Sequence, residues 1–218
     1  MSVTAEAAES FVLGHTGLAP VPLVPEIRTY QADDAIALWE ITEELHGGPG
    51  LAPPFWAFPW AGGQALARYV LDHPDLVAGR SVLDLAAGSG LVALAASLAG
   101  ARSVVANEID PYAIAAIRLN AAANARGIQP YQGNLLVETA TDVDVVLAGD
   151  VFYNRDMATA MLRFLRAARD RGAVVLAGDP GRAYVPTDDL VRVASLAVPV
   201  IRDLEDADIK ETVLWRLP

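Results

Sequence analysis

The sequence predicts an α/β protein with a doubly wound, mostly parallel, seven-stranded sheet, an antiparallel C-terminal edge hairpin, and an N-terminal helical and irregular extension. Three observations predict this fold. Short apolar runs alternate with helical segments between residues 81 and 176, as in strands joined by crossover helices. Residues 81–93 pass from an apolar strand through a loop of small residues into a helix. Only residues 203–209 separate the last two apolar runs, and so short a connection joins antiparallel strands.

The N-terminal extension is predicted to cover residues 1–52, and the main domain residues 53–218. Three prolines and little periodicity make residues 1–31 an irregular arm, with one short extended segment at 27–30. A helix is predicted to begin at Asp33 and Asp34, to run to Leu45, and to end at a glycine-rich break. An aromatic-rich stretch at 53–60 precedes a helix from Gly62 or Gly63 to Asp72.

Strands and helices then alternate to the end of the chain. The predicted strands are 82–85, 104–107, 128–131, 143–147, 173–176, 197–201 and 212–217. The predicted helices are 90–99, 110–125, 155–171 and a weaker one at 188–196. Asp110 followed by Pro111 is a typical helix start, because proline fits the first helical position.

Composition excludes several classes of function. The chain has 218 residues, 53% of them hydrophobic, and a net charge of −11, which opposes binding to a nucleic-acid backbone. Cysteine is absent, so disulfides, thiolate zinc sites and cysteine nucleophiles are excluded. The histidines, His15, His46 and His73, are scattered beside glycine or proline, and no metal site is predicted. The acidic start lacks the basic region of a signal peptide, and no apolar run could span a bilayer; a cytoplasmic protein is expected.

The loop after the first strand of the alternating region indicates a nucleoside cofactor. Small residues let backbone N–H groups and a helix N-terminus approach a ligand, and Glu108 at the tip of the next strand can accept both ribose hydroxyls. Gly88–Ala93 also fits the dinucleotide pattern G-x-G-x-x-A. However, Asp84 precedes the loop, and a carboxylate there is unfavourable beside a pyrophosphate. It suits S-adenosylmethionine, which carries an ammonium and a sulfonium and no phosphate.

Longer segments resemble one family. They are residues 56–69, 81–84, 106–111, 149–153 and 178–182. Over about residues 55–182 and the last few residues, the chain resembles the seven-stranded S-adenosylmethionine-dependent methyltransferases. Within that class it is most similar to the electron-transfer flavoprotein beta-subunit lysine methyltransferases and their bacterial relatives. It departs from the family at Ala86, which replaces a glycine and fits without strain at negative φ, and at Asn134, which replaces an aspartate.

The resemblance implies transfer of a methyl group from S-adenosylmethionine, leaving S-adenosylhomocysteine, to a lysine of a protein such as electron-transfer flavoprotein beta subunit. Methylation of a small nicotinamide-like amine, a catalytically silent binding module and, more remotely, an NAD(P)-binding Rossmann protein are alternatives. No nucleic-acid or membrane partner is predicted.

The resemblance also implies the roles of single residues. The implied cofactor-binding residues are Trp60, Asp84, Ala86, Ala87, Gly88, Gly90, Glu108, Asn134, Leu135 and Gly149. The implied catalytic residues are Asp150 and Tyr153, and the implied substrate-binding residues are Trp56, Phe58, Asp179 and Arg182. Purely structural roles compete: Asp84 as a backbone cap, Asn134 in an Asx turn, Trp60 in the core, and residues 179–182 as a turn.

Overall fold

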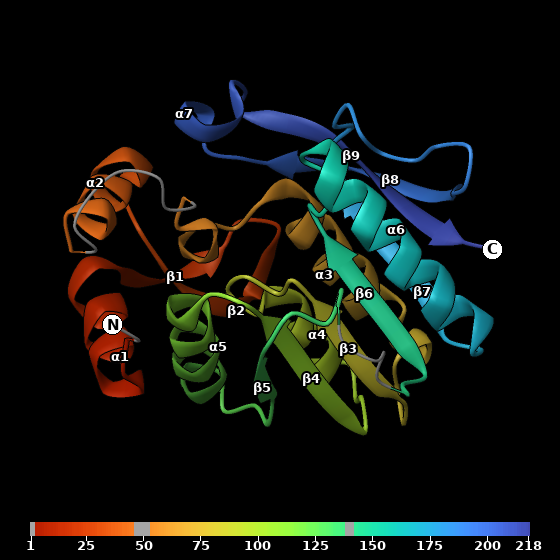
Figure 1. Cartoon of the computed structure of the whole chain (residues 1–218), viewed down its shortest axis with the longest axis horizontal. Helices are drawn as coiled ribbons and strands as arrows, with labels where there is room; N and C mark the ends of the chain where they lie inside the picture. Colours follow the sequence, from red (N-terminus) through yellow and green to blue (C-terminus); the bar gives the residue numbers. More distant parts are fainter. Residues whose placement is uncertain (1–2, 46–52, 138–141) are drawn as a thin grey trace.

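The computed structural model describes residues 3–45, 53–137 and 142–218 (Figure 1). A seven-stranded sheet has the order β5-β4-β3-β6-β7-β9-β8, in which β9 runs antiparallel to both β7 and β8. The remaining neighbours are parallel, so the predicted fold class is confirmed. The strands are β3 (Ser81–Leu85), β4 (Ser103–Glu108), β5 (Gln129–Gln132), β6 (Val145–Gly149), β7 (Val174–Asp179), β8 (Val191–Pro199) and β9 (Ile209–Leu217).

The helices lie close to their predicted positions. They are α2 (Ala35–Leu45), α3 (Ala61–Asp72), α4 (Leu91–Leu98), α5 (Pro111–Ala123) and α6 (Arg155–Asp170), with the short turns η1 (Phe55–Ala57) and η2 (Pro74–Leu76). Asp110 caps α5 as predicted, its Oδ1 accepting a hydrogen bond from the Tyr112 N–H at 2.8 Å. No helix in the described ranges is long and apolar enough to cross a membrane.

The prediction of an irregular arm over residues 1–31 was wrong. These residues form helix α1 (Ala5–His15) and a hairpin of β1 (Gly17–Val21) and β2 (Val24–Gln31); the extended segment at 27–30 lies within β2. The prolines misled the prediction because they stand where strands tolerate them. Pro20 adjoins a register shift in the ladder, and Pro22 lies in the turn. His46 and the glycine-rich break lie outside the described residues.

The weak helix predicted at 188–196 was also wrong, because this segment is most of strand β8. Val191 and Val193 are β-branched, and β9 pairs with the segment in antiparallel orientation along most of its length, with one register shift between Arg192 and Ala194. This pairing outweighs the helix propensity of the neighbouring alanines and leucine. The predicted antiparallel hairpin at the sheet edge is confirmed. Its connection contains a one-turn helix, α7 (Arg202–Glu205), that the sequence analysis did not anticipate.

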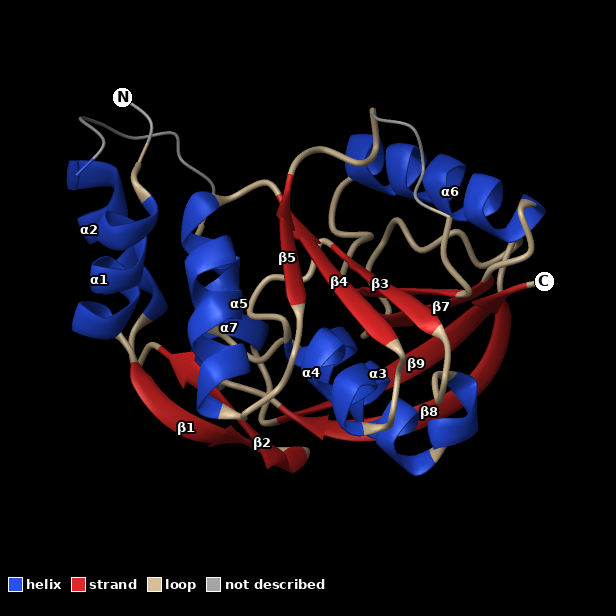
Figure 2. Cartoon of the chain, turned by 90° about the horizontal axis from the view of Figure 1, so that it is seen from below, coloured by secondary structure: helices blue, strands red, loops and turns tan. Residues whose placement is uncertain are grey.

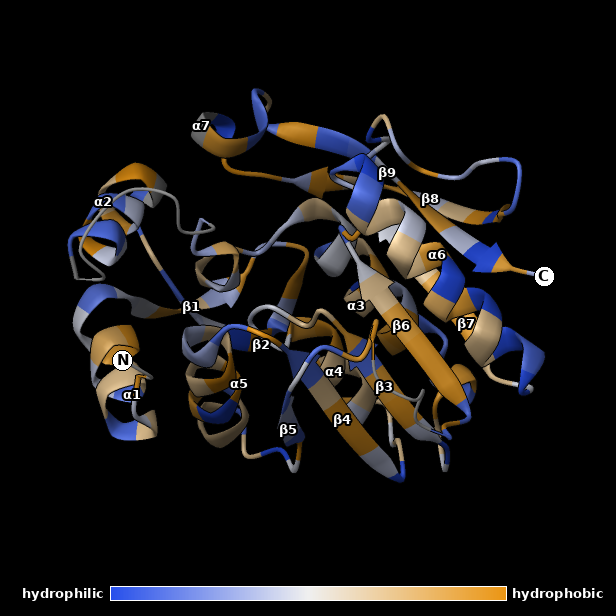
Figure 3. Ribbon diagram, viewed as in Figure 1, coloured by the Kyte–Doolittle hydropathy of each residue, from blue (hydrophilic) through white to orange (hydrophobic). Residues whose placement is uncertain are grey.

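Both faces of the sheet are buried. In β6, Val145 and Leu147 pack into the core beneath α3 and α4, whereas Val146 and Ala148 pack into the core beneath α6. Figure 2 shows α6 on one side of the sheet and α3 and α4 on the other. Two-sided burial explains why the central strands are continuous apolar runs rather than alternating ones, and Figure 3 shows β6 hydrophobic along most of its length.

The N-terminal elements pack onto α5 and the main core. Asn120 accepts a hydrogen bond from the Tyr30 N–H at 2.7 Å and donates one to the Ser89 carbonyl at 2.9 Å. Asn124, one turn later, accepts from the Arg28 N–H at 3.0 Å. These amides satisfy the free edge of β2, which would otherwise expose unpaired backbone groups. The boundary at residue 52 stays a prediction.

Candidate active site

A cavity of about 780 Å³ opens where the carboxyl ends of β3, β4 and β6 meet. The strand order reverses between β3 and β6, and ligands of doubly wound sheets bind at such a reversal. The volume lies within the roughly 300–1,000 Å³ typical of small-molecule sites. The predicted site residues that line it are Trp56, Phe58, Trp60, Asp84, Ala86, Ala87, Gly88, Glu108, Asn134, Gly149, Asp150, Tyr153 and Arg182.

Gly90, Leu135 and Asp179 were predicted in the site but do not line the cavity. Gly90 is the left-handed N-cap of α4, and its Cα faces Ile117. The Leu135 side chain is buried in the core beneath α6, because the turn that begins at Asn134 directs it inward. Asp179 caps a turn. These three residues therefore support the loops and turns around the cavity, and their side chains do not line it.

The loop after β3 is left-handed at three positions. Gly88 and Gly90 have φ of 53° and 76°, and Ala86 has φ of 55°. The condition under which an alanine fits here without strain, a negative φ, is therefore not met at Ala86. An alanine in this region costs roughly 1–2 kcal/mol, and strain of this kind is concentrated at functional sites.

Replacing Ala86 with glycine is expected to stabilise the donor-free protein by about 0.5–1 kcal/mol, because relief of the left-handed strain exceeds the added entropy of the unfolded chain. Ala87 has no positive φ, so Ala87→Gly should instead destabilise by a similar amount. Urea unfolding of both variants measures the difference. Opposite signs confirm that strain is stored at Ala86, and two losses of stability contradict it.

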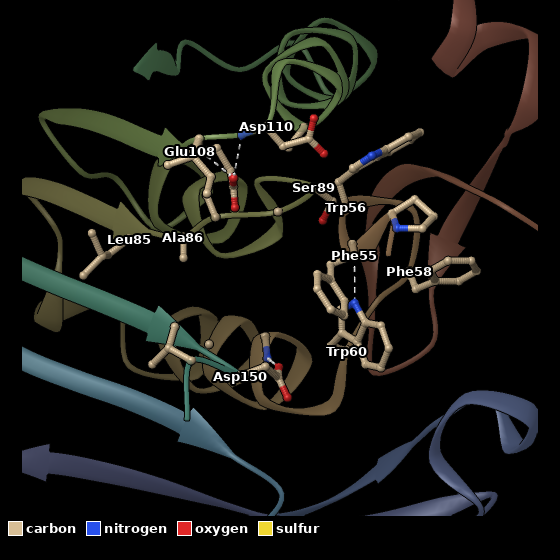
Figure 4. A pocket seen from close by; sticks show the side chains of 18 of the residues that line it. Phe55, Trp56, Phe58, Trp60, Leu85, Ala86, Ser89, Glu108, Asp110 and Asp150 are labelled. Carbon is tan, nitrogen blue, oxygen red and sulfur yellow. Dashed lines mark hydrogen bonds between the residues drawn. The ribbon is translucent and has the colours of Figure 1, made fainter. Parts of the chain in front are cut away.

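Two acids stand at the ends of adjacent strands. Asp84 is 1% exposed, and its Oδ2 accepts a hydrogen bond from the Ala93 N–H in the first turn of α4 at 2.8 Å. Burial raises the pKa of Asp84 to about 7, with a further increase from Glu108 and a partial offset from the Ala93 hydrogen bond. Glu108 Oε2 accepts from the Ile109 and Asp110 N–H groups at 2.7 and 3.2 Å (Figure 4). Burial raises its pKa too.

Asn134 follows the carboxyl end of β5, the edge strand that pairs in parallel with β4, so it lies at the same sheet edge as Glu108. Its Oδ1 accepts a hydrogen bond from the Leu136 N–H at 3.1 Å, which is the Asx turn that the sequence allowed. Asn134 and Leu136 both line the cavity, whereas Leu135 between them does not. The interaction of Asn134 with an adenine edge stays a prediction.

Aromatic rings form the wall opposite the acids (Figure 4). Trp60 donates its indole N–H to the Phe55 carbonyl at 2.7 Å. The Phe55 ring lies 5.8 Å from that of Trp60 and 5.7 Å from that of Tyr153. Trp56 and Phe58 also reach the cavity but are almost fully buried, packed with α1 and α5. The exposed part of this wall is therefore Phe55, Trp60 and Tyr153.

Asp150 ends β6 in a left-handed conformation with φ of 57°. Its Oδ2 accepts a hydrogen bond from the Gly63 N–H at 2.8 Å, and its Oδ1 accepts one from Arg182 Nη2 at 3.1 Å. Burial raises the pKa of Asp150 to about 6, while Arg182 and Gly63 lower it. Asp179 Oδ1 accepts from the N–H groups of Gly181 and Arg182 at 2.8 and 2.7 Å, so it holds the turn that carries Arg182.

Sequence reasoning missed several cavity residues. Phe55 belongs to the same aromatic stretch as Trp56 and Phe58, and its place at the start of that stretch was a usable signal. Ser89 lies within the glycine loop and was also available. Val3, Thr42 and Leu204 reach the cavity from α1's leading residues, α2 and α7, and nothing local in the sequence marks them.

Comparison with known proteins identifies the family. A chain from Xenopus laevis named electron transfer flavoprotein beta subunit lysine methyltransferase is 39% identical over 191 residues, 87% of this chain and 76% of that protein. Its namesake from Mus musculus is 44% identical over 201 residues, 88% of this chain and 77% of that protein. The chain belongs to the electron transfer flavoprotein beta subunit lysine methyltransferase family. It is therefore a methyltransferase of the S-adenosylmethionine-dependent class, as the resemblance implied.

A family model and solved structures also match this chain. The model for ribosomal protein L11 methyltransferase matches residues 64–160. The magnesium protoporphyrin IX methyltransferase of Synechocystis, solved with bound S-adenosylmethionine, has a TM-score of 0.53 at 13% identity, covering 72% of this chain and 78% of that one. A 16S rRNA methyltransferase from T. Thermophilus also has a TM-score of 0.53, at 22% identity, covering 73% of this chain and 44% of that one. These two structures show the shared fold.

Proposed function

We propose that this chain binds S-adenosylmethionine in the cavity and methylates lysine side chains of electron transfer flavoprotein beta subunit. The observation that carries the proposal is the match to relatives named for that substrate, 35–44% identical over 87–95% of this chain. The cavity supports it, because it joins two acids, a glycine loop and an aromatic wall in one space.

The residues around the loop fit the methyl donor. A buried carboxylate at Asp84 suits an ammonium group, and no basic side chain of the described residues at the loop would prefer a phosphate. In this proposal Glu108 accepts hydrogen bonds from the ribose hydroxyls, and the amide of Asn134 meets the adenine edge. When bound, the donor supplies a methyl group on a sulfonium, which is open to attack by a neutral amine.

In this proposal the acceptor amine is bound by Asp150 and by the aromatic wall. A lysine has a reference pKa near 10.4, so its amine must lose a proton before it can react. Burial against Phe55, Trp60 and Tyr153 disfavours the charged amine. Asp150 orients the amine by accepting a hydrogen bond from it, and the apolar walls exclude water from the path.

Tritiated methyl donor separates the possible acceptors. We expect label to enter the beta subunit of purified cognate electron transfer flavoprotein, and mass spectrometry to place it on lysine. A lysate and a panel of small amines that includes nicotinamide serve as parallel acceptors. Label confined to small molecules would replace the proposal with small-amine methylation. Calorimetric binding of NADH, and none of S-adenosylhomocysteine, would refute methyl transfer altogether.

Replacing Asp150 with asparagine is expected to lower kcat by about 100-fold, as misplacement of a reacting group does, with less than a threefold change in the affinity for S-adenosylhomocysteine. Asparagine tolerates the left-handed backbone at this position, and its amide oxygen can still accept from the Gly63 N–H. Turnover assays and calorimetry on the same preparation test it. Normal turnover would remove Asp150 from the reaction.

A further inference from the structure

The positively charged guanidinium of Arg182 lies at the edge of the acceptor site. Its guanidinium lies 3.1 Å from Asp150 Oδ1 and 3.7 Å from Glu205 Oε1, and its carbon lies 5.9 Å from the centre of the Trp60 ring. The side chain is 26% exposed and lines the cavity. A carboxylate and an aromatic face are also what a substrate ammonium would seek, so Arg182 lies where it can compete with that charge.

The surrounding charges keep Arg182 in place. Glu205 reaches it from α7 and also pairs with Lys210 on β9, whose Nζ lies 2.9 Å from Glu205 Oε2. Asp179, which caps the turn, adds a third nearby carboxylate. Asp150, which follows β6, completes the group of carboxylates next to the guanidinium. Glu108 and Tyr153 line the same cavity. These ion pairs therefore fix the Arg182 side chain within the site.

A lone carboxylate beside the acceptor would hinder the reaction. It would attract a lysine ammonium but stabilise the protonated form, which cannot attack a methyl group. The acceptor site therefore needs an oxygen that accepts a hydrogen bond from the amine. It also needs a net charge around that oxygen that does not stabilise the protonated ammonium form.

We propose that Arg182 is a positioning residue that neutralises Asp150, so that the carboxylate orients a neutral acceptor amine instead of trapping an ammonium. The inference rests on the proposed function. Asp150 Oδ2 accepts a hydrogen bond from the Gly63 N–H and Oδ1 accepts one from Arg182, and the Gly62 backbone also interacts with this carboxylate. A carboxylate has about four lone-pair sites, so it can still accept a hydrogen bond from the amine. The guanidinium also opposes a second positive charge nearby, which lowers the pKa of the bound amine.

The pH dependence of turnover tests the inference. Arg182→Gln is expected to lower kcat at pH 7.5 by about tenfold and to move the rising limb of the kcat profile to higher pH by about one unit, as loss of an opposite charge does. KM for the protein substrate should change less than threefold, because the uncompensated Asp150 still attracts the ammonium. Arg182→Lys should restore most of the profile. Arg68→Gln is the control, since Arg68 is similarly buried and pairs with Glu26 and Asp72, away from the cavity.

A second measurement needs no activity. Carbon-13 NMR of the aspartate carboxyl groups, with Asp150→Asn for assignment, follows the titration of Asp150 in the donor-free protein. Arg182→Gln should raise the pKa of Asp150 by about one unit, and Arg182→Lys should reverse most of this increase. An unchanged Asp150 titration, or a kcat profile that superimposes on the wild type, would overturn the inference. If the wild type methylates no protein, the proposed function fails by itself, while the titration still decides the pairing of Arg182 with Asp150.

Discussion

Replacing Gly62 with alanine is expected to destabilise the protein by about 3 kcal/mol and to abolish most activity. A Cβ at Gly62 would lie 2.2 Å from the Gly178 carbonyl oxygen and 2.7 Å from Asp150 Oδ2. Relief of such overlap requires α3 to move away from the ends of β6 and β7, and overpacking of this kind typically costs 1–3 kcal/mol or more. The gain of about 1 kcal/mol from alanine's helix propensity is smaller, so the clash decides the sign.

The neighbouring glycine is the matched control for this prediction. A Cβ at Gly63 would lie no closer than 4.0 Å to Asp150 Oδ2, so Gly63→Ala should be neutral or slightly stabilising. Urea unfolding compares the two variants, and turnover assays show whether displacement of α3 also disturbs Asp150. Equal stability of Gly62→Ala and Gly63→Ala would contradict the close approach of helix and sheet.

Replacing Asp84 with asparagine is expected to stabilise the donor-free protein at pH 8 while weakening its affinity for S-adenosylhomocysteine by about 100-fold. Loss of one partner of a buried charge pair costs about 2–5 kcal/mol of binding. The stability gain has a separate cause, the ionisation of a buried acid. The folded pKa of about 7 exceeds the ordinary 3.8, so between these values the folded state binds more protons and stability falls as pH rises.

The pH series makes this prediction specific. Near pH 4 Asp84→Asn should be less stable than the wild type by roughly 2 kcal/mol, because its new amide N–H groups are buried at every pH. Its relative stability should then rise by ~4 kcal/mol, the equivalent of three pKa units, up to about pH 7. Above pH 7 the gain should stay constant at roughly 2 kcal/mol.

Asp144→Asn is the control for the Asp84 series. Asp144 hydrogen-bonds Ser81 at the opposite end of β3, and these bonds lower its pKa. Its contribution to stability is therefore present at neutral pH and lost in acid, the reverse of Asp84. Asp144→Asn should bring no gain at pH 8 and should leave ligand affinity unchanged. Unaltered affinity in Asp84→Asn would remove Asp84 from the donor site.

The alternating region was predictable because its signals are local. Apolar runs of strand length, the cap at Asp110 and the small residues after Asp84 each act within a few positions, and the structure has a strand, a helix start and a loop there. Parallel connectivity then brings the acids at the ends of neighbouring strands to one sheet edge. The sequence alone therefore indicates Asp84, Glu108 and Asp150 as residues of one site.

The errors share a different cause. Residues 17–31 and 191–199 became strands because distant partners, the amides of α5 and the strand β9, complete their hydrogen bonds. Ala86 takes a left-handed backbone, and an alanine in the sequence does not signal that conformation. Local propensity is weak beside such tertiary contacts.

The order of residues alone was enough to establish the fold class, the family and most of the cavity lining, since hydrophobic spacing and loop chemistry are encoded over short stretches. Folding in three dimensions added the pairings that link distant segments: Arg182 with Asp150, and Gly62 against Gly178. These contacts depend on how closely α3 approaches the ends of β6 and β7. Their physical origin is the packing of backbone against backbone, which spacing along the chain does not record.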